Sequence, residues 1–540
     1  WDVGGTYTQT EVCPACGGAR LRPEYLAVTL AGASIYQLSE MPLVDLLDVL
    51  HTVDTAGFAD HPALDSLTIC VRRLRFLLQV GLGYLNLNRV TATLSAGEAQ
   101  RIKLAGLLGS QLTALTVLLD EPSRGMHPSE VEALLAALTE LRDAGNTVIV
   151  VEHDPLFMHS ADYLIDMGPG AGVLGGDIVA QGTPEQVQQA DTVTAQWLRG
   201  ERQVILPSSR RTPRRWMTIH GARANNLRGE LVRVPLGTLT GVCGVSGSGK
   251  STLMLDTLGR VLVPKKQTTS VAYEPVDPGE HDRITGAPSR AILLDQSRQG
   301  ISSPLAYLEL LKPLITLYAE SEDALALGIG EKTLAEPCSV CKGHGSTRIE
   351  MGFLPDVHVP CDACQGSGYA PEAWGVRLRG AALPELNELT VDEVYTLFGD
   401  VESLARPLKL ARAVGLGYLV MCQPGYSLSS GEAQRLKIVG ELCRKTTQET
   451  LYILDEPTVG QSLEDIRQLV MVLQRLVDDG HTVIVIEHHP HVLAMCDWLI
   501  ELGPGGGPAG GQVIAAGTPE EVARGNTPTA LYLRRILEET

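Results

Sequence analysis

The chain has 540 residues, a length that predicts two to four globular domains. Hydrophobic residues make up 44% and charged residues 20%, and this composition excludes wholesale disorder. Lys and Arg total 44 against 63 Asp and Glu, so the formal net charge of −19 excludes a generally basic coat for nucleic acid, although not a local basic groove. No apolar run is long enough to cross a membrane, and an aromatic content of 4% argues against stacking platforms for single strands.

The N-terminal end is unusual. The chain begins with Trp1 instead of Met, and no signal-peptide pattern follows it. We therefore expect that part of the protein precedes this residue, and that the protein is cytoplasmic. Cys13 and Cys16 then form a CxxC pair, which in a cytosolic chain indicates a metal site or a redox motif. The pair is a candidate zinc half-site whose partner pair is absent from the sequence.

An internal repeat organises the chain, with an offset of 334 residues at its first two blocks (81 to 415) and 335 afterwards (119 to 454). The repeated blocks are GLGYL at 81–85 and 415–419, Ser-x-Gly-Glu-Ala-Gln-Arg at 95–101 and 429–435, Leu-Asp-Glu-Pro at 119–122 and 454–457, and Thr-Val-Ile-Val-x-Glu-His at 147–153 and 482–488. Apolar β-branched runs alternate with helical segments around each block, as at 116–120, 129–143 and 147–151. This pattern predicts two homologous α/β halves, each with a buried parallel sheet.

The two halves are joined by a stretch without periodicity. Residues 201–215 are rich in Pro, Ser and Arg, which predicts an exposed linker between a first half at 1–200 and a second half at 216–540. Its arginines, Arg210, Arg211, Arg214 and Arg215, favour a hinge over a DNA site.

A phosphate-binding loop is the most specific motif. Gly244–Ser251 has the full GxxxxGK[ST] pattern, between an apolar strand at 239–243 and a helix at 252–258. In such a loop the backbone N–H groups wrap phosphates, Lys250 reaches the β- and γ-phosphates, and Ser251 ligates Mg²⁺. The predicted ATP-binding residues are Gly244, Ser246, Gly247, Gly249, Lys250, Ser251 and Thr252. The pattern does not occur before residue 244.

Acidic residues and a histidine follow two predicted strands of the second half. Asp455 and Glu456 end the apolar run 451–454, where one carboxylate can hold Mg²⁺ and the next can act as general base on water. His488 closes the following strand and is predicted to contact the γ-phosphate. A strand-end histidine is more often structural, but its repetition at His153 favours a functional role.

Four cysteines in the second half have the spacing of a metal site. Cys338 and Cys341 are followed, after 19 residues, by Cys361 and Cys364. Two CxxC pairs at this separation predict a tetrahedral zinc site, with two redox pairs as the alternative. Four basic residues lie near this module in the sequence, and each alone is more often a solvated surface residue: Lys342, Arg348, Arg377 and Arg379.

The Ser-x-Gly-Glu-x-Gln-Arg blocks are similar to the signature of ABC ATPases. Together with GLGYL, the DEPS and DEPT strand ends, the GPG turns at 168–170 and 503–505 and the CxxC modules, they make the whole chain resemble the C-terminal portion of the UvrA family, the damage-sensing ATPases of nucleotide excision repair. The resemblance implies ATP, Mg²⁺ and Zn²⁺ as cofactors. It also implies damaged double-stranded DNA, a UvrB-type helicase and a second copy of the chain as partners. In relatives the zinc module lies near the DNA groove, so the resemblance makes Lys342, Arg348, Arg377 and Arg379 candidate DNA-phosphate contacts.

The resemblance also implies roles for individual residues, because the halves of this family pack head to tail. The complete site would combine the phosphate loop with Gln296, Asp455, Glu456 and His488 of the second half and with Ser95, Gly97 and Glu98 of the first. Lys250, Gln296, Glu456 and His488 would be its catalytic residues. A second site would combine Asp120, Glu121 and His153 with Ser429, Gly431 and Glu432, and it lacks a phosphate loop in this sequence.

Three other functions stay open at this point. A UvrA-like paralogue that confers resistance to DNA-binding drugs would keep the ATPase, and the short, weakly basic stretch after Gln296 favours it. An ABC transporter subunit is disfavoured by the four-cysteine module and by the roughly 180 residues between Lys250 and Ser429. An inert assembly fragment is compatible with a single phosphate loop.

Overall fold

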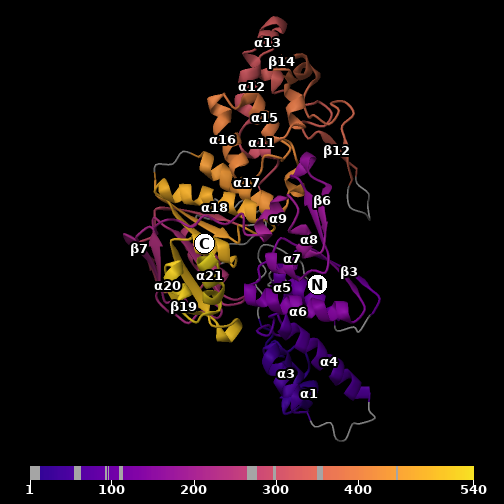
Figure 1. Cartoon of the computed structure of the whole chain (residues 1–540), viewed down its shortest axis with the longest axis vertical. Helices are drawn as coiled ribbons and strands as arrows, with labels where there is room; N and C mark the ends of the chain where they lie inside the picture. Colours follow the sequence, from indigo (N-terminus) through magenta and orange to yellow (C-terminus); the bar gives the residue numbers. More distant parts are fainter. Residues whose placement is uncertain are drawn as a thin grey trace.

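The computed structural model describes residues 12–53, 62–91, 94, 96–108, 113–263, 277–295, 300–349, 357–444 and 448–539. The molecule is elongated, with α13 (Glu322–Leu327) at one end of its long axis and α1 (Pro23–Leu26), α3 (Leu43–His51) and α4 (Pro62–Gln79) at the other (Figure 1). The main sheet of the second half lies between these helical ends (Figure 1). Among the described residues no helix has the length and apolar character needed to span a bilayer.

The second half is built on a six-stranded sheet in the order β11-β16-β17-β9-β18-β19. Its parallel strands are β11 (Arg290–Leu294), β16 (Thr450–Asp455), β17 (Thr482–Ile486), β9 (Leu239–Cys243) and β18 (Trp498–Gly503), and β19 (Gln512–Gly517) is antiparallel to β18. Because the carboxyl ends of parallel strands meet at one edge, the loops after β9, β16 and β17 converge there.

Both faces of this sheet are covered. Leu451 and Ile453 of β16 pack into the core that includes η3 (Thr252–Gly259), whereas the alternate residues Tyr452 and Leu454 pack into the core that includes α17 (Ser430–Cys443) and α18 (Leu463–Asp478). This alternation explains the continuous apolar runs of the central strands, since each residue faces a helical layer. The helix predicted at 252–258 is confirmed, with π-type hydrogen bonding.

Smaller elements complete the second half. An antiparallel sheet is formed by β7 (Arg215–His220), β8 (Val232–Leu236) and β10 (Arg283–Thr285). The remaining helices outside the insertion are α10 (Arg260–Leu262), α19 (Pro490–Met495), α20 (Pro519–Ala523) and α21 (Pro528–Glu539). The insertion between β11 and α17 holds α11 (Pro304–Tyr307), α12 (Leu311–Ala319), α13, α14 (Glu331–Leu334), α15 (Val391–Phe398), α16 (Glu402–Ala413) and the two-stranded sheets β12–β13 (Ser346–Ile349, Val357–Pro360) and β14–β15 (Arg377–Leu378, Ala381–Ala382).

The first half repeats part of this architecture. The parallel pair β3 (Thr116–Asp120) and β4 (Thr147–Val151) flanks α6 (Pro128–Asp143), and β5 (Leu164–Gly168) pairs antiparallel with β6 (Asp177–Gly182). Before and after them lie β1 (Thr29–Leu30), β2 (Ala33–Ser34), α2 (Ile35–Glu40), α5 (Ala96–Leu108), α7 (Pro155–Ser160), α8 (Pro184–Val187) and α9 (Val193–Leu198). The repeat makes β4 and β5 equivalent to β17 and β18, between which β9 lies. The described part of the first half has no strand at the place of β9.

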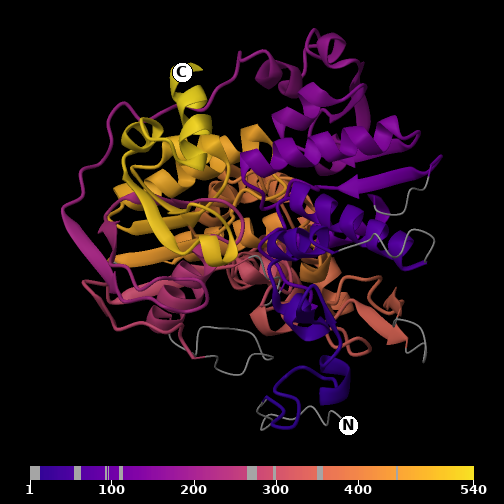
Figure 2. The ribbon, with the colours of Figure 1, turned by 90° about the horizontal axis from the view of Figure 1, so that it is seen from below.

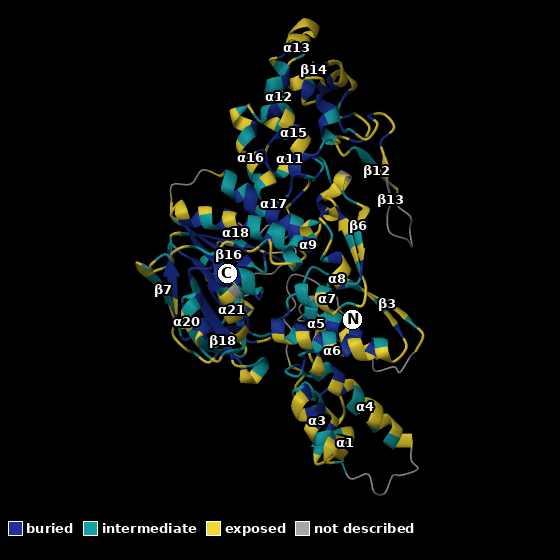
Figure 3. Cartoon of the chain, in the orientation of Figure 1, coloured by how far each residue is buried: buried dark blue, intermediate teal, exposed yellow. Residues whose placement is uncertain are grey.

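The parallel strands predicted at 116–120 and 147–151 are confirmed, but the prediction that they are buried is wrong. Leu118 in β3 is 73% exposed, and Ile149 and Val151 in β4 are 48% and 56% exposed. Figure 3 shows the contrast between these strands and the buried sheet of the second half. The reason is that one face of the β3–β4 pair has no covering layer among the described residues.

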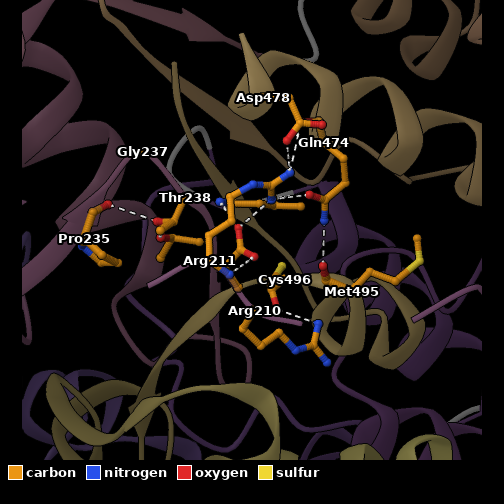
Figure 4. Close-up of polar contacts among 12 residues, drawn as sticks. Arg210, Arg211, Pro235, Gly237, Thr238, Gln474, Asp478, Met495 and Cys496 are labelled. Carbon is orange, nitrogen blue, oxygen red and sulfur yellow. Dashed lines mark hydrogen bonds and ion pairs between the residues drawn. The ribbon is translucent and has the colours of Figure 1, made fainter. Parts of the chain in front are cut away.

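The two halves lie side by side (Figure 2), with α6 facing α21. The linker between them is fastened to the second half at Arg210 and Arg211 (Figure 4). Arg210 donates to the carbonyl of Cys496 at 2.9 Å, and Arg211 pairs with Asp497 at 2.8 Å and Asp478 at 2.6 Å. The prediction of an exposed linker is therefore wrong at these two arginines, whose charges are compensated by the second half.

Candidate functional site

The phosphate-type loop Gly244–Ser251 connects the end of β9 to η3. Gly244, Gly247 and Gly249 have φ of 129°, 70° and 104°, backbone conformations that glycine adopts without strain. The side chain of Lys250 is buried, and its Nζ donates to two carbonyls of the same loop at 2.9 and 2.8 Å. Burial lowers the pKa of Lys250, while nearby carboxylates, Glu130 first, oppose this change. The carbonyls of the loop thus hold the buried Lys250 side chain in place.

Asp455, Glu456 and His488 meet beside this loop. Asp455 ends β16, and Glu456 has a φ of 45°, which is rare for a residue with a side chain and marks local strain. The Nε2 of His488, which follows β17 and Glu487, lies 3.5 Å from the Glu456 Oε1. The structure therefore brings together three residues that the sequence places at two strand ends.

Burial sets the protonation of these groups. It raises the pKa of Asp455 to about 7, with repulsion from Glu456 as the next cause. It lowers the pKa of His488, so the ring is neutral near pH 7 and can donate from Nε2. Burial by itself would raise the pKa of Glu456, but the hydrogen bond from His488 and the positive charges of Lys250 and Arg124 lower it. Glu456 is thus an ionised carboxylate with a fixed hydrogen-bond donor.

A second glutamate organises this edge and has no predicted role. Glu487 is buried and accepts hydrogen bonds from the backbone N–H of Thr458 at 3.1 Å and of His488 at 3.0 Å. Burial raises its pKa to about 7. In the first half, Glu152 makes the equivalent bonds to Ser123 and His153, at 2.8 and 2.9 Å. The sequence signal for this residue was available in the repeated Glu-His pair.

The first-half signature helix α5 lies against the phosphate loop of the second half. Glu98 is buried, and the Arg101 Nη2 lies 3.5 Å from the Ser246 Oγ in the loop. Ser246 also donates to Glu130 of α6 at 2.7 Å. Gly97 lies so close to the Arg124 carbonyl that an added Cβ would be 2.7 Å from it. Of the other predicted site residues, Ser95 and Gln296 lie outside the described residues, and Ser251 and Thr252 open η3.

The second predicted set comes together in a similar way. Asp120 ends β3, and the His153 Nε2 lies 4.0 Å from the Oε1 of Glu121, whose φ is 44°. Burial raises the pKa of Glu121. On the other half, Ser429 caps α17 by accepting from the Glu432 N–H at 3.1 Å, and Gly431 packs on the Val459 carbonyl.

The two sets touch each other across the interface. An added Cβ on Gly125 would lie 3.2 Å from the Glu456 carboxylate, and one on Gly460 would lie 2.7 Å from Glu121. Arg124 donates to the Ser430 Oγ at 3.3 Å. Both glutamates and both strand-end histidines line one cavity between the halves. Sequence reasoning missed these crossed glycines, although they occupy equivalent positions of the repeat.

The four-cysteine group has the geometry that a zinc ion requires. Its sulfur atoms lie within 4.8 Å of one another, with 4.0 Å between Cys338 and Cys361 and 3.6 Å between Cys341 and Cys364. A tetrahedron with Zn–S bonds of 2.3 Å has sulfur separations of about 3.8 Å. Backbone N–H groups, that of Cys341 first, lower the pKa of Cys338 to about 7, which favours the thiolate. These four residues therefore fit Zn²⁺.

The other metal and DNA candidates are less supported. Cys13 is exposed, and among the described residues no cluster of metal-ligand atoms includes Cys13 or Cys16. Near the four cysteines, Lys342 is exposed, whereas Arg377 and Arg379 pair with Glu385 and Asp400, both at 2.9 Å. The side chain of Arg348 lies outside the described residues. The two paired arginines are thus partly neutralised within the chain.

A phosphate loop, an Asp-Glu strand end, a strand-end histidine and a signature helix from the opposite half define the ABC-ATPase fold. The same fold is seen in a structure of ribosome-bound archaeal Pelota and ABCE1, with a TM-score of 0.50 and 18% identity over 92% of this chain and 64% of that chain. UvrABC system protein A of Thermus thermophilus is 44% identical over 542 residues, 97% of this chain and 56% of that protein. This chain belongs to the UvrA family.

Further relatives agree with this assignment. UvrABC system protein A of Bacillus subtilis is 41% identical over 545 residues, 98% of this chain and 56% of that protein. The crystal structure of UvrA2 from Deinococcus radiodurans has a TM-score of 0.82 and 38% identity, over 97% of this chain and 66% of that chain. No family model matches the chain. The chain spans 56% of the length of both curated relatives.

Proposed function

We propose that this chain carries the ATPase machinery of a damage-recognition subunit in nucleotide excision repair. The observation that supports this best is the contact between the signature helix α5 of one half and the phosphate loop of the other, beside Glu456 and His488. The composite site would consist of Gly244–Ser251, Gln296, Asp455, Glu456 and His488 from the second half and Ser95, Gly97 and Glu98 from the first.

Each residue of this site has a chemical role in the proposal. Lys250 and the loop N–H groups bind the phosphates, and Gln296 takes the catalytic role that its likeness to the family's Q-loop implies. Glu456, ionised and oriented by His488, accepts the proton of that water. His488 also faces the γ-phosphate. The second set, which combines residues 120, 121 and 153 with residues 429, 431 and 432, contributes contacts at the interface. No phosphate-loop motif accompanies this set in the sequence.

Ser251 and Asp455 would hold Mg²⁺, which when bound neutralises charge on the phosphate oxygens. The surroundings of Asp455 fit a cation, because this half-buried carboxylate is repelled by the charges of Glu456, Asp295 and Glu487 and its pKa is raised to about 7. A divalent cation would relieve that repulsion. The four clustered cysteine sulfurs likewise fit Zn²⁺ as a structural ion in the insertion.

ATP turnover by the purified chain tests the enzyme. We expect Lys250→Ala to lower turnover by at least about 100-fold, because the phosphate charge loses its buried cation. Lys332→Ala, at an exposed lysine of α14 in the insertion, is the matched control. Equal turnover in wild type and Lys250→Ala would contradict the proposed site.

We further propose that the chain acts on duplex DNA in the cytoplasm, as a dimer that passes the lesion to a UvrB-type helicase. Recognition by shape and deformability suits one protein that meets chemically varied lesions. The names of the relatives and the zinc-type module support this role. Among the candidate contacts, exposed Lys342 is favoured over the paired Arg377 and Arg379.

Binding to damaged and undamaged duplexes at one fixed salt concentration tests this second step. Tighter binding to the damaged duplex is expected. Equal affinity for both would favour the paralogue that confers resistance to DNA-binding drugs.

A further inference from the structure

Tyr84, the tyrosine of the first GLGYL block, lies on the phosphate loop of the opposite half. A Cβ added to Gly247 would be 2.7 Å from the Cε2 and Cζ of its ring. A Cβ added to Gly506 would be 2.7 Å from the Cδ1, and one added to Gly507 would be 2.8 Å from the Tyr84 Cβ. The Gly507 N–H in turn donates to the Gly247 carbonyl at 3.0 Å. The ring therefore covers both the loop and the turn that supports it.

The hydroxyl of the same tyrosine reaches the signature helix of its own half. It donates to the Oε1 of Glu98, which is 6% exposed. Burial and the Glu98 charge raise the pKa of Tyr84, so the hydroxyl keeps its proton and remains a donor. Arg101, on the same helix, approaches Ser246. Helix α5 thus contacts Ser246 through Arg101 and Gly247 through Tyr84.

The repeat contains the same arrangement. Tyr418 donates to the Glu432 Oε1 at 2.6 Å. An added Cβ on Gly172 would lie 3.1 Å from the Tyr418 Cβ and 3.4 Å from its Cδ2, and Gly172 corresponds to Gly507. A tyrosine held by the signature glutamate and packed on the opposite half is therefore a feature of both interfaces. In the described residues only Tyr84 has a phosphate loop beneath it.

We propose that Tyr84 is a positioning residue of the nucleotide site, supplied by the half that does not carry the phosphate loop. Its ring holds Gly247 in the conformation that presents the loop N–H groups, and its hydroxyl ties this contact to Glu98 of the signature. Glycine-rich loops lose much conformational freedom when a ligand orders them. A loop ordered in advance binds phosphate at a smaller entropic cost. This inference rests on the proposed nucleotide site at Gly244–Ser251.

The test is calorimetric titration of the 540-residue chain with Mg²⁺ and a non-hydrolysable ATP analogue, together with steady-state ATP turnover. We expect Tyr84→Ala to weaken nucleotide affinity by about tenfold and to raise KM similarly, with kcat at saturation within about twofold. Tyr84→Phe keeps the ring and should recover most of the affinity. Tyr163→Ala, at an exposed tyrosine of the first half, is the control.

A double-mutant cycle separates positioning from packing. If the hydroxyl acts through Glu98, then Tyr84→Phe combined with Glu98→Gln should weaken binding no more than the larger single effect. Additive effects would overturn the link to the signature, and wild-type affinity in Tyr84→Ala, with an unchanged melting temperature, would overturn the positioning role. Absence of nucleotide binding by the wild type would instead contradict the proposed function itself.

Discussion

Ile149 in β4 and Ile484 in β17 occupy the same position of the repeat, in Thr-Val-Ile-Val segments, yet they have different surroundings. The side chain of Ile149 is 48% exposed, whereas that of Ile484 is fully buried. β17 lies between β16 and β9 and is covered on both faces, whereas β4 pairs with β3 alone among the described strands. An apolar β-branched run therefore specifies a strand, while neighbouring elements determine whether the strand is buried.

The predicted catalytic Glu-His pairs of the two halves also differ in exposure. His488 and Glu456 are 3.5 Å apart with side chains 8% and 24% exposed, and His153 and Glu121 are 4.0 Å apart at 42% and 28%. Water screens the more open pair, which weakens its electrostatic coupling. Identical residue types thus form a tight acid–base pair in one half and a looser one in the other.

The largest expected difference is in zinc binding, between the four-cysteine group of the insertion and the N-terminal pair Cys13 and Cys16. We expect the chain to bind zinc at Cys338, Cys341, Cys361 and Cys364, and Cys361→Ser to release it and destabilise the insertion by several kcal/mol, because a structural zinc contributes directly to folding. Cys16→Ser should leave the zinc content unchanged. Atomic absorption and thermal melting measure both effects, and zinc loss from Cys16→Ser would show that the N-terminal pair is also a ligand.

The second largest contrast is expected in the stability that is lost when each of the two equivalent isoleucines is shortened. Ile484→Ala leaves a cavity in a core covered on both sides and should lower the free energy of unfolding by about 3 kcal/mol. Ile149→Ala removes a half-exposed side chain and should cost less than about 1 kcal/mol. Urea denaturation of the two variants makes the comparison. Equal losses would mean that the exposed face of β4 is covered in solution.

The two glutamates should have unequal effects on ATP turnover. Glu456→Gln keeps the shape of the side chain but removes the base, so turnover should fall by about 100-fold. Glu121→Gln should reduce turnover by less than about fivefold, since its contact to the working site is indirect, through Gly460. Similar losses in the two variants would indicate that both sites hydrolyse ATP.

The smallest expected effect is that of pH on Mg²⁺ affinity. Because the pKa of Asp455 is raised to about 7, its carboxylate is mostly protonated at pH 6 and mostly ionised at pH 8, so Mg²⁺ affinity should rise by about tenfold over this range. In the metal-free chain the sign is reversed for folding: the bound proton stabilises the fold, and this stability is lost as pH rises through about 7. Mn²⁺ binding followed by electron paramagnetic resonance measures the affinity. Metal affinity that does not change with pH, or that changes equally in the Asp455→Asn variant, would contradict this role of Asp455.

Sequence reasoning worked where local pattern and short-range geometry decide the outcome. The phosphate loop, the Asp455–Glu456 strand end and the parallel strands were predictable, because motif spacing and strand order bring the carboxyl ends of β9, β16 and β17 to one edge. The four cysteines were predictable from their spacing. The prediction of an exposed linker was wrong, because Arg211 forms ion pairs with Asp478 and Asp497, which are distant in the chain.

The sequence by itself determined two related α/β halves, the position of the phosphate-loop motif and the spacing of the four clustered cysteines. Only the tertiary structure decided which surfaces are buried and which residues of one half serve the other. Tyr84 lies on Gly247, 163 positions later in the chain, and Gly125 lies against Glu456. Such contacts depend on how two packed halves meet. No local propensity encodes that docking, because the free energy of each contact comes from burial between surfaces that are remote along the chain.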